Sequence, residues 1–263
     1  MSDNLLNRYG PWALVTGASS GIGRAFAYEL AERKFNLVLV ARSKDVLEAI
    51  AIEIKSKFAV EVCVITADLG NSAGSRAVLD QVESMEIGLL VASAGFGGSG
   101  PFVEGDVLHD LDMIQVNCTA CVELTHSLSQ KMKGRKRGGV ILLSSLLGWQ
   151  GVPLSAIYAA TKSFIQSFAE AIHIELKPDG VDVLAVAPGP VVTNFDRRAN
   201  MTIEKGATPK IVAQQALTAL GRRSTVVPGP LSKLLTYSLL ALPRAVRVRI
   251  MRQIMSGLSN HGK

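Results

Sequence analysis

Short, almost uninterrupted apolar runs alternate with longer helical patterns through most of this 263-residue chain. Runs without polar alternation suit strands that are covered on both faces. Alternation of such strands with helices favours a parallel, doubly wound sheet. The sequence therefore predicts an α/β fold built on a single Rossmann-like sheet of about seven strands. The predicted strands are Trp12–Val15, Asn36–Val40, Glu61–Thr66, Leu89–Ala92, Val140–Leu143, Val181–Ala187 and Thr225–Val227.

The helical patterns lie between these runs, and neither an internal repeat nor a linker divides the chain. We expect one dinucleotide-binding and catalytic domain at residues 1–228. A C-terminal helical extension at residues 229–263 is expected to pack on that same domain. The predicted helices are Arg24–Arg33, Lys44–Phe58, Ser72–Ser84, Val107–Lys133 and Tyr158–Leu176.

The composition excludes several other classes of protein. A chain that is 48% hydrophobic and 19% charged must bury a core, so it is not dominated by disorder. Three cysteines are too few for a disulfide framework. The N-terminal segment lacks the apolar run of a secretory signal, and no apolar stretch is long enough to span a membrane. The expected location is the cytoplasm.

Positive charge is concentrated at the C-terminal end. The segment Gly221–Lys263 holds eight Lys or Arg residues and no acid, while the remainder, with 20 basic and 22 acidic residues, carries a net charge of −2. This distribution argues against a nucleic-acid binder. The extension is expected to pack over the substrate cleft, and a peripheral contact with an anionic lipid surface is the alternative. Its predicted apolar stripe is Val246, Ile250, Ile254 and Leu258.

A glycine-rich turn follows the first predicted strand and opens a helix. Glycines at 17, 21 and 23 allow the backbone to turn sharply and to approach a pyrophosphate at the positive end of that helix. The spacing is G-x-x-x-G-x-G, which differs from the common G-x-G-x-x-G. A tight turn that binds nothing is the alternative, but the strand–turn–helix context favours a dinucleotide. The predicted contacts are Gly17, Ser19, Ser20, Gly21, Ile22 and Gly23.

The end of the second strand indicates which dinucleotide is bound. A carboxylate at that point would bind the ribose 2′-hydroxyl of NAD. The chain instead has Arg42, Ser43 and Lys44, with no acid before Asp45. A guanidinium can pair bidentately with a 2′-phosphate, so Arg42 and Ser43 predict NADP(H). A solvated arginine without a ligand is the alternative.

Four residues form a candidate catalytic set. Ser145 ends a predicted strand, and Tyr158 and Lys162 lie thirteen and seventeen residues later, four apart on one helix face. An ammonium beside a phenol is expected to lower the tyrosine pKa from about 10. Tyr158 could then exchange a proton with a substrate oxygen that Ser145 holds. Asn117, in the long predicted helix, is the candidate to orient Lys162 or a bridging water.

In these motifs the chain resembles the classical short-chain dehydrogenase/reductase family over roughly residues 10–228. The turn at Thr16–Gly23 matches the family's cofactor motif, and Asn117, Ser145, Tyr158 and Lys162 match its catalytic residues in order and spacing. The resemblance implies an NAD(P)-dependent oxidoreductase, with Tyr158 and Lys162 also near the cofactor. The further cofactor contacts it implies are Asp68, Leu69, Ala94, Gly95, Pro188, Gly189, Val191 and Thr193.

One motif departs from the family pattern. The chain has Ala92-Ser93-Ala94-Gly95 where the family usually has Asn-Asn-Ala-Gly. With Ser93 as a partial substitute for the missing amide, we expect a small effect on stability and no loss of catalysis. The resemblance also implies a homodimer or homotetramer formed through the two long helices Val107–Lys133 and Tyr158–Leu176.

Other signals carry less weight. Cys118 and Cys121 form a C-x-x-C pair inside a predicted helix, and no further Cys or His at ligand spacing completes a metal site. We therefore expect two buried thiols and no metal. Two alternatives to an enzyme stay open: a nucleotide-sensing protein without turnover, and a lipid-surface interaction protein that acts through the extension.

The loops after the predicted strands should select the substrate. Their side chains are apolar, and no arginine clamp for a small keto acid appears in the first two loops. The prediction is NADPH-dependent reduction of a small apolar ketone or aldehyde to an alcohol, with Tyr158 as proton donor. The residues predicted to line the substrate site are Phe96, Leu147, Trp149 and Phe195.

Overall fold

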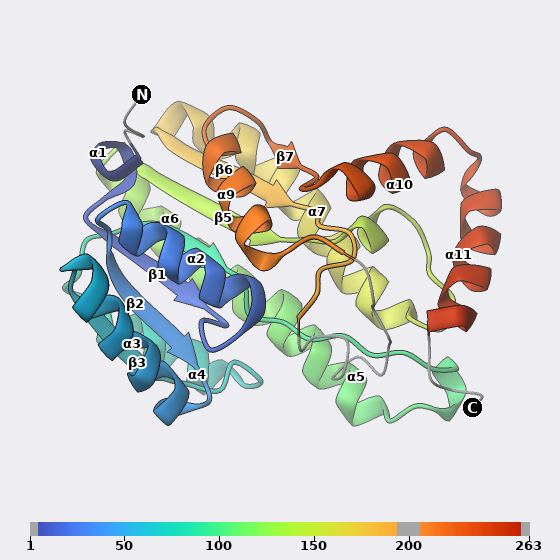
Figure 1. The fold of residues 1–263 in the computed structure, drawn as a ribbon, viewed down its shortest axis with the longest axis horizontal. Helices are drawn as coiled ribbons and strands as arrows, with labels where there is room; N and C mark the ends of the chain where they lie inside the picture. The colour runs from blue at the N-terminus through green and yellow to red at the C-terminus, as the bar shows by residue number, and fades with distance from the viewer. Residues whose placement is uncertain (1–4, 194–205, 259–263) are drawn as a thin grey trace.

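The computed structural model describes residues 5–193 and 206–258, and it contains one seven-stranded sheet in which every pairing is parallel. The strand order is β3-β2-β1-β4-β5-β6-β7 (Figure 1). This confirms the predicted Rossmann-like α/β fold, with strand limits that differ from the predicted ones by at most two residues. The strands are β1 (Trp12–Thr16), β2 (Asn36–Ala41), β3 (Val62–Thr66), β4 (Ile87–Ala92), β5 (Gly138–Leu143), β6 (Val181–Val186) and β7 (Thr225–Val226).

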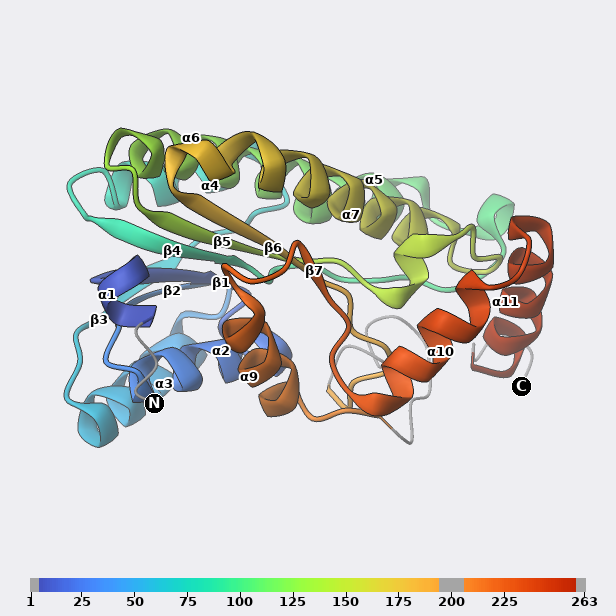
Figure 2. The same cartoon turned by 90° about the horizontal axis from the view of Figure 1, so that it is seen from above.

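Helices cover both faces of the sheet, as the continuous apolar strands require (Figure 2). Two separate cores result, one on each face. Phe26 and Leu30 are fully buried in the first core, and Leu124 and Ile165 in the second. The first face carries α1 (Leu5–Tyr9), α2 (Gly21–Glu32), α3 (Lys44–Phe58) and α9 (Pro209–Ala219), and the second carries α4 (Ser72–Gln81), α6 (Ala120–Gly134) and α7 (Ala156–Leu176).

The long helix predicted at Val107–Lys133 is interrupted. A π-helical turn at Gln115–Thr119 separates α5 (Val107–Ile114) from α6. Turns of this kind insert a residue into the helical ladder and often occur at functional sites. The turn contains Asn117, and its side chain bonds to backbone outside the helix. The remaining short turns are 3₁₀ segments at Phe102–Glu104, Leu146–Trp149 and Lys177–Asp179.

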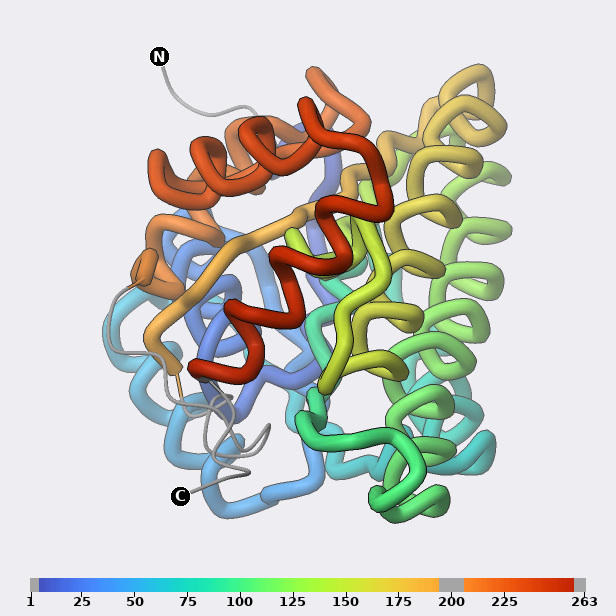
Figure 3. Tube along the Cα trace, turned by 90° about the vertical axis from the view of Figure 1, so that its right-hand side faces the viewer, coloured from blue at the N-terminus to red at the C-terminus, as the bar shows by residue number. Residues whose placement is uncertain are grey.

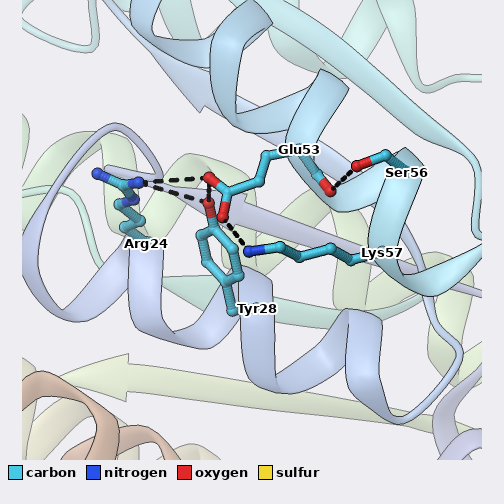
Figure 4. Close-up of polar contacts among 5 residues, drawn as sticks. All are labelled: Arg24, Tyr28, Glu53, Ser56 and Lys57. Atoms are coloured by element: carbon cyan, nitrogen blue, oxygen red, sulfur yellow. Dashed lines mark hydrogen bonds and ion pairs between the residues drawn. The ribbon is translucent and has the colours of Figure 1, made fainter.

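A polar cluster joins α2 to α3 at the surface (Figure 4). The hydroxyl of Tyr28 donates to the carboxylate of Glu53, which also accepts a hydrogen bond from Lys57 Nζ at 2.6 Å. Arg24 Nη2 donates to the Tyr28 hydroxyl at 3.4 Å and lies 3.7 Å from Glu53 Oε2. Ser56 Oγ donates to the Glu53 carbonyl at 2.8 Å. These exposed contacts add little stability, but they give the Arg24 guanidinium partners within the protein.

The C-terminal extension forms α10 (Pro230–Leu240) and α11 (Arg244–Leu258) at one end of the molecule (Figures 1 and 2). Met251 and Met255 of α11 are buried, and they pack with Val152, Ala159 and Leu239. Within the part of the chain that the structure describes, every helix is too short or too polar to cross a bilayer.

The predicted apolar stripe of α11 is wrong at two positions. Val246 and Ile254 are 38% and 39% exposed, whereas Met251 and Met255 form the buried face. Ile250 is partly buried against the same cluster, and the side chain of Leu258 lies outside the described residues. Apolar residues occur on every side of this helix, so a four-residue spacing could not single out the face that packs.

Candidate active site

The glycine-rich turn lies where the sheet changes direction. The chain builds β2 and β3 on one side of β1 and then β4 on the other, which leaves a crevice at the carboxyl ends of β1 and β4. Gly17 has a φ of +66°, and a Cβ placed there would lie 3.0 Å from the Cα and the amide nitrogen of Ala94. The turn thus needs glycine both for its conformation and for the close approach of the neighbouring loop.

The Thr16 side chain, for which the sequence predicted no role, holds these two loops together. Thr16 Oγ1 accepts hydrogen bonds from the amide nitrogens of Ser93, at 3.0 Å, and Ala94, at 2.9 Å. The feature of the sequence that could have indicated this role is the position of Thr16: it is the one hydroxyl residue of an otherwise apolar strand, directly before the first glycine of the turn. These two hydrogen bonds position the Ser93–Ala94 loop beside the glycine-rich turn.

Helix α2 begins at Gly21, and its N-cap residue Ser20 makes no side-chain capping bond. An anion can therefore approach the positive end of the helix without displacing a capping side chain. Gly23 lies so close to the turn that a Cβ would be 2.4 Å from the Gly17 carbonyl oxygen. A groove of about 850 Å³ opens beside this turn, with Gly21, Arg24, Val192 and Thr193 among the residues that line it.

Arg42, which is predicted to select NADP(H) over NAD(H), follows directly after the last residue of β2. Arg42 is exposed and forms no ion pair or side-chain hydrogen bond with any other residue that the structure describes, in contrast to Arg24. The next residue, Ser43, is the N-cap of α3 and makes no side-chain capping bond. After β3, Asp68 Oδ1 accepts a hydrogen bond from the Gly70 amide at 3.0 Å, while Leu69 is buried in the core.

The four residues of the candidate catalytic set are all buried at the ends of β5, α7 and the π turn. Ser145, Tyr158, Lys162 and Asn117 are 8%, 8%, 6% and 3% exposed, respectively. The hydroxyls of Ser145 and Tyr158 share a hydrogen bond, and Ser145 Oγ also accepts one from the Leu147 amide at 3.2 Å. Lys162 Nζ lies 5.7 Å from the centre of the Tyr158 ring.

Burial dominates the acid–base properties of this set. It raises the pKa of Tyr158 to about 12, while the Ser145 hydrogen bond acts in the opposite direction. It also lowers the pKa of Lys162 to about 8. The expected net fall of the tyrosine pKa below 10 is therefore wrong for this structure, because the cost of desolvating a phenolate exceeds the lowering effect of the hydrogen bond. Near neutral pH, Tyr158 is a phenol and Lys162 is mostly an ammonium.

Asn117 connects the π turn to the loop after β4. Its Nδ2 donates to the Phe96 carbonyl at 2.9 Å and to Thr161 Oγ1 at 3.1 Å, and its Oδ1 accepts from the Phe96 amide at 3.1 Å. Asn117 therefore positions Thr161, which directly precedes Lys162 in the chain, and does not bond to Lys162 itself. A Cβ at Gly95 would lie 2.8 Å from Asn117 Oδ1 and 3.5 Å from Lys162 Nζ, so glycine keeps these groups close together.

The loops that follow β5 and β6 close the site from the other side. The Leu146 amide donates to the Pro188 carbonyl at 2.9 Å, and the Gly189 amide donates to Ser232 Oγ of α10 at 3.1 Å. Val191 forms a parallel bridge with Ala207. Thr193 contacts the glycine-rich turn, where a Cβ at Gly21 would meet its Cγ2 at 3.4 Å. The segment predicted to reach the cofactor thus lies over the turn at the start of α2.

Three of the four predicted substrate residues fall within the described residues. The Phe96 ring lies 5.1 Å from that of His109. Leu147 packs against the cluster formed with the C-terminal extension. Trp149 accepts a hydrogen bond from Arg247 Nη1 at its carbonyl oxygen, at 3.4 Å. Phe195 lies outside the described residues.

Among the described residues, the C-x-x-C pair is not part of a cluster that could hold a metal ion. Cys118 and Cys121 are buried free thiols, and burial raises the pKa of Cys121 to about 12. Such a thiol is not a thiolate near neutral pH. Among the described residues, no three His, Cys, Asp or Glu side chains gather where they could hold a metal ion.

Taken together, a glycine-rich turn at the sheet's switch point and a buried Ser–Tyr–Lys set define a candidate dinucleotide-dependent oxidoreductase. The family model for short chain dehydrogenases matches residues 11–204. The chain belongs to the short-chain dehydrogenase/reductase family, whose members use NAD(H) or NADP(H).

Among curated proteins, the human very-long-chain 3-oxoacyl-CoA reductase is 34% identical over 220 residues, which cover 82% of this chain and 70% of that protein. A very-long-chain 3-oxoacyl-CoA reductase-like protein of Arabidopsis thaliana is also 34% identical, over 85% of this chain and 74% of its own length.

Solved structures agree with this assignment. A 7β-hydroxysteroid dehydrogenase matches with a TM-score of 0.87 at 26% identity, over 95% of this chain and 99% of that one. A short-chain dehydrogenase from Sphingobium yanoikuyae, in complex with NADPH, matches with a TM-score of 0.80 at 31% identity, over 92% and 95%.

Proposed function

We propose that this protein is an NADPH-dependent reductase that converts an apolar ketone or aldehyde to an alcohol. The observation that carries the proposal is the buried Tyr158 phenol, which shares a hydrogen bond with Ser145 and lies one helical turn from Lys162. A phenol held as the acid suits the direction of reduction, in which the substrate oxygen gains a proton.

NADPH is proposed over NADH because of the charge at the end of β2. Arg42 is exposed and unpaired within the described part of the chain, so a 2′-phosphate would meet a cation without having to break an ion pair. The Sphingobium relative, whose structure holds NADPH, supports this choice. When bound, this cofactor supplies a hydride to the carbonyl carbon.

The chain itself supplies the turn that takes the cofactor's phosphates and the loops on either side of it. Glycines 17, 21 and 23 leave room for a close backbone approach, and the Ala94–Gly95 loop lies directly beside the turn. The remaining proposed contacts are Ser19, Ser20, Ile22, Ser43, Asp68, Leu69, Pro188, Gly189, Val191 and Thr193, together with Tyr158 and Lys162.

The proposed roles of the catalytic residues follow from their geometry. Ser145 holds the substrate oxygen, and the Tyr158 hydroxyl gives that oxygen its proton as negative charge develops there. The ammonium of Lys162 stabilises the phenolate that remains. Asn117 is a positioning residue, because its bonds fix the Phe96 backbone and Thr161 beside Lys162.

An apolar substrate is proposed from the loops and from the relatives. Phe96, Leu147 and Trp149 follow β4 and β5, and Phe195 follows β6 along the chain. The similar proteins are named for very-long-chain 3-oxoacyl-CoA, for a hydroxysteroid and for bulky-bulky ketones. All three names describe long-chain or bulky carbonyl or alcohol compounds.

We also propose a homodimer or homotetramer that forms through α5, α6 and α7. Large apolar side chains remain exposed on two of these helices, as on subunit interfaces. They are Val107, Leu108, Leu111 and Ile114 on α5, and Phe164 and Ile174 on α7.

The proposed reaction is tested by following NADPH oxidation with aldehydes and ketones of graded chain length, with NADH in parallel. We expect turnover that rises with apolar length and requires NADPH. Turnover only with short keto acids would contradict the proposed substrate class, and equal rates with NADH would contradict the role of Arg42. NADPH binding without turnover on any compound would favour a nucleotide-sensing protein instead.

A further inference from the structure

Helix α10 buries two hydroxyl side chains together with Leu239 and leaves several large apolar side chains exposed. Ser232 and Thr236 are each 2% exposed, whereas Leu234 and Tyr237 are 67% and 63% exposed. A surface helix normally buries its apolar face and turns its polar side chains to solvent. We call the exposed set Leu231, Leu234, Tyr237 and Leu240 the outer face of α10.

The contacts of Ser232 and Leu239 fix the helix in this orientation. Ser232 Oγ accepts a hydrogen bond from the Gly189 amide at 3.1 Å, and a Cβ at Gly189 would lie 2.6 Å from that oxygen. Leu239 at the other end joins the buried cluster with Met251 and Met255. The helix is thus fixed at both ends, and rotating it to bury the outer face would break these contacts.

The two helices of the extension also carry unpaired positive charge. Lys233, Arg244, Arg249 and Arg252 are exposed, and none of them forms an ion pair with another residue that the structure describes. From Gly221 to Lys263 the chain contains no acid. Figure 3 shows α10 and α11 together on the side that faces the viewer. An exposed apolar helix face in an extension that also carries unpaired cations is typical of a segment that binds an anionic membrane surface.

Charge also argues against a second copy as the occupant of this face. Self-association through it would bring two sets of unpaired cations together without an acidic partner. Negatively charged headgroups would instead pair with the cations, while leucine side chains and a tyrosine enter the headgroup boundary, where tyrosine is favoured.

We propose that the outer face of α10, with the cations of α10 and α11, binds the surface of an anionic lipid bilayer. The contact is peripheral, since α10 has eleven residues and lies on the surface of the domain. It is independent of the proposed reaction, because lipid binding requires neither cofactor nor turnover.

The test is flotation of the full chain with phosphatidylcholine vesicles that either contain or lack phosphatidylglycerol, at low and high salt. The wild type is expected to bind only the anionic vesicles, and salt should release it. The pair Leu234→Gln and Tyr237→Gln should weaken binding at least about tenfold. The pair Arg249→Gln and Arg252→Gln should weaken it roughly 25-fold, at about fivefold per charge near the surface.

The matched control is the pair Val46→Gln and Ile52→Gln, which removes exposed apolar side chains from α3, 43% and 71% exposed, and should leave vesicle binding unchanged. Circular dichroism checks that each variant is folded. Failure of the wild type to bind anionic vesicles would overturn the proposal, and so would equal binding to anionic and neutral vesicles. A loss of vesicle binding in the control variant as large as that in the Leu234/Tyr237 variant would overturn it as well. If the wild type does not bind vesicles and the Leu234/Tyr237 variant forms a smaller assembly in solution than the wild type, the outer face of α10 is a self-association surface instead.

Discussion

Lys162 Nζ donates a hydrogen bond to the Leu143 carbonyl oxygen at 2.7 Å, and thereby ties α7 to the last residue of β5. Ser144 Oγ donates to the Lys162 carbonyl at 3.0 Å, so the same two segments are joined twice. Ser145 and Tyr158, which flank these contacts in the chain, are consequently held within hydrogen-bonding distance of each other.

The buried ammonium has a thermodynamic consequence. The pKa of Lys162 is about 8 in the folded protein and about 10.5 when unfolded, so between these values the unfolded state binds more protons. Its contribution to stability therefore rises with pH through this window. Relative to Lys162→Met, the wild type should gain about 2–3 kcal/mol in unfolding free energy between pH 7 and pH 10. Denaturant titrations at several pH values measure this gain, and parallel curves for the two proteins would contradict it.

Replacing Arg42 should change the choice of cofactor. Arg42→Ala is expected to raise the KM for NADPH by about 10- to 100-fold and to leave that for NADH nearly unchanged, because a charge-assisted pair with the 2′-phosphate is lost. Steady-state kinetics with both cofactors provide the measurement. The control Arg76→Ala removes an exposed cation from α4 and should alter neither value. An equal effect on both cofactors would mean that Arg42 does not contact the 2′-phosphate.

Thr16 should matter for both stability and cofactor binding. Thr16→Val keeps the shape of the side chain but leaves the Ala94 amide without its acceptor and the Ser93 amide with the Val91 carbonyl, at 3.1 Å, in place of two acceptors. We expect a loss of about 1–3 kcal/mol and weaker NADPH binding. Thr16→Ser retains the hydroxyl and should restore most of both. Thermal unfolding and cofactor titration measure the effects, and a Val variant as stable as the wild type would show that the tie is dispensable.

Tyr9 supports the sheet from the N-terminal helix. It is fully buried, and its hydroxyl donates to Asp182 Oδ2 at 2.6 Å, beside the ion pair of that carboxylate with Arg8. Tyr9→Phe should lower the unfolding free energy by about 1–2 kcal/mol, because the Asp182 carboxylate loses one donor. Tyr237→Phe, at an exposed tyrosine, is the control and should have no effect. Identical unfolding curves for all three proteins would contradict this role of Tyr9.

The sequence predicted the sheet well because parallel strands, buried on both faces, read as continuous apolar runs. It predicted that Ser145, Tyr158 and Lys162 would lie close together, because their positions follow from one helix and one strand end. It did not predict the hydrogen bonds of Thr16, the π turn around Asn117 or the exposed apolar side chains of α10. Each of these depends on a contact between segments far apart in the chain, such as Ser232 with Gly189. The sequence also did not predict that the pKa of Tyr158 is raised, because the spacing of Tyr158 and Lys162 does not reveal how deeply the two side chains are buried.

The central claim is that Tyr158 donates the proton in an NADPH-dependent reduction. Its most direct test is turnover and NADPH binding by Tyr158→Phe, with Tyr237→Phe at an exposed tyrosine of α10 as the matched control. We predict that Tyr158→Phe loses turnover by at least about 10³-fold and binds NADPH as the wild type does, while the control retains both. Turnover by Tyr158→Phe at a rate near that of the wild type would contradict the account.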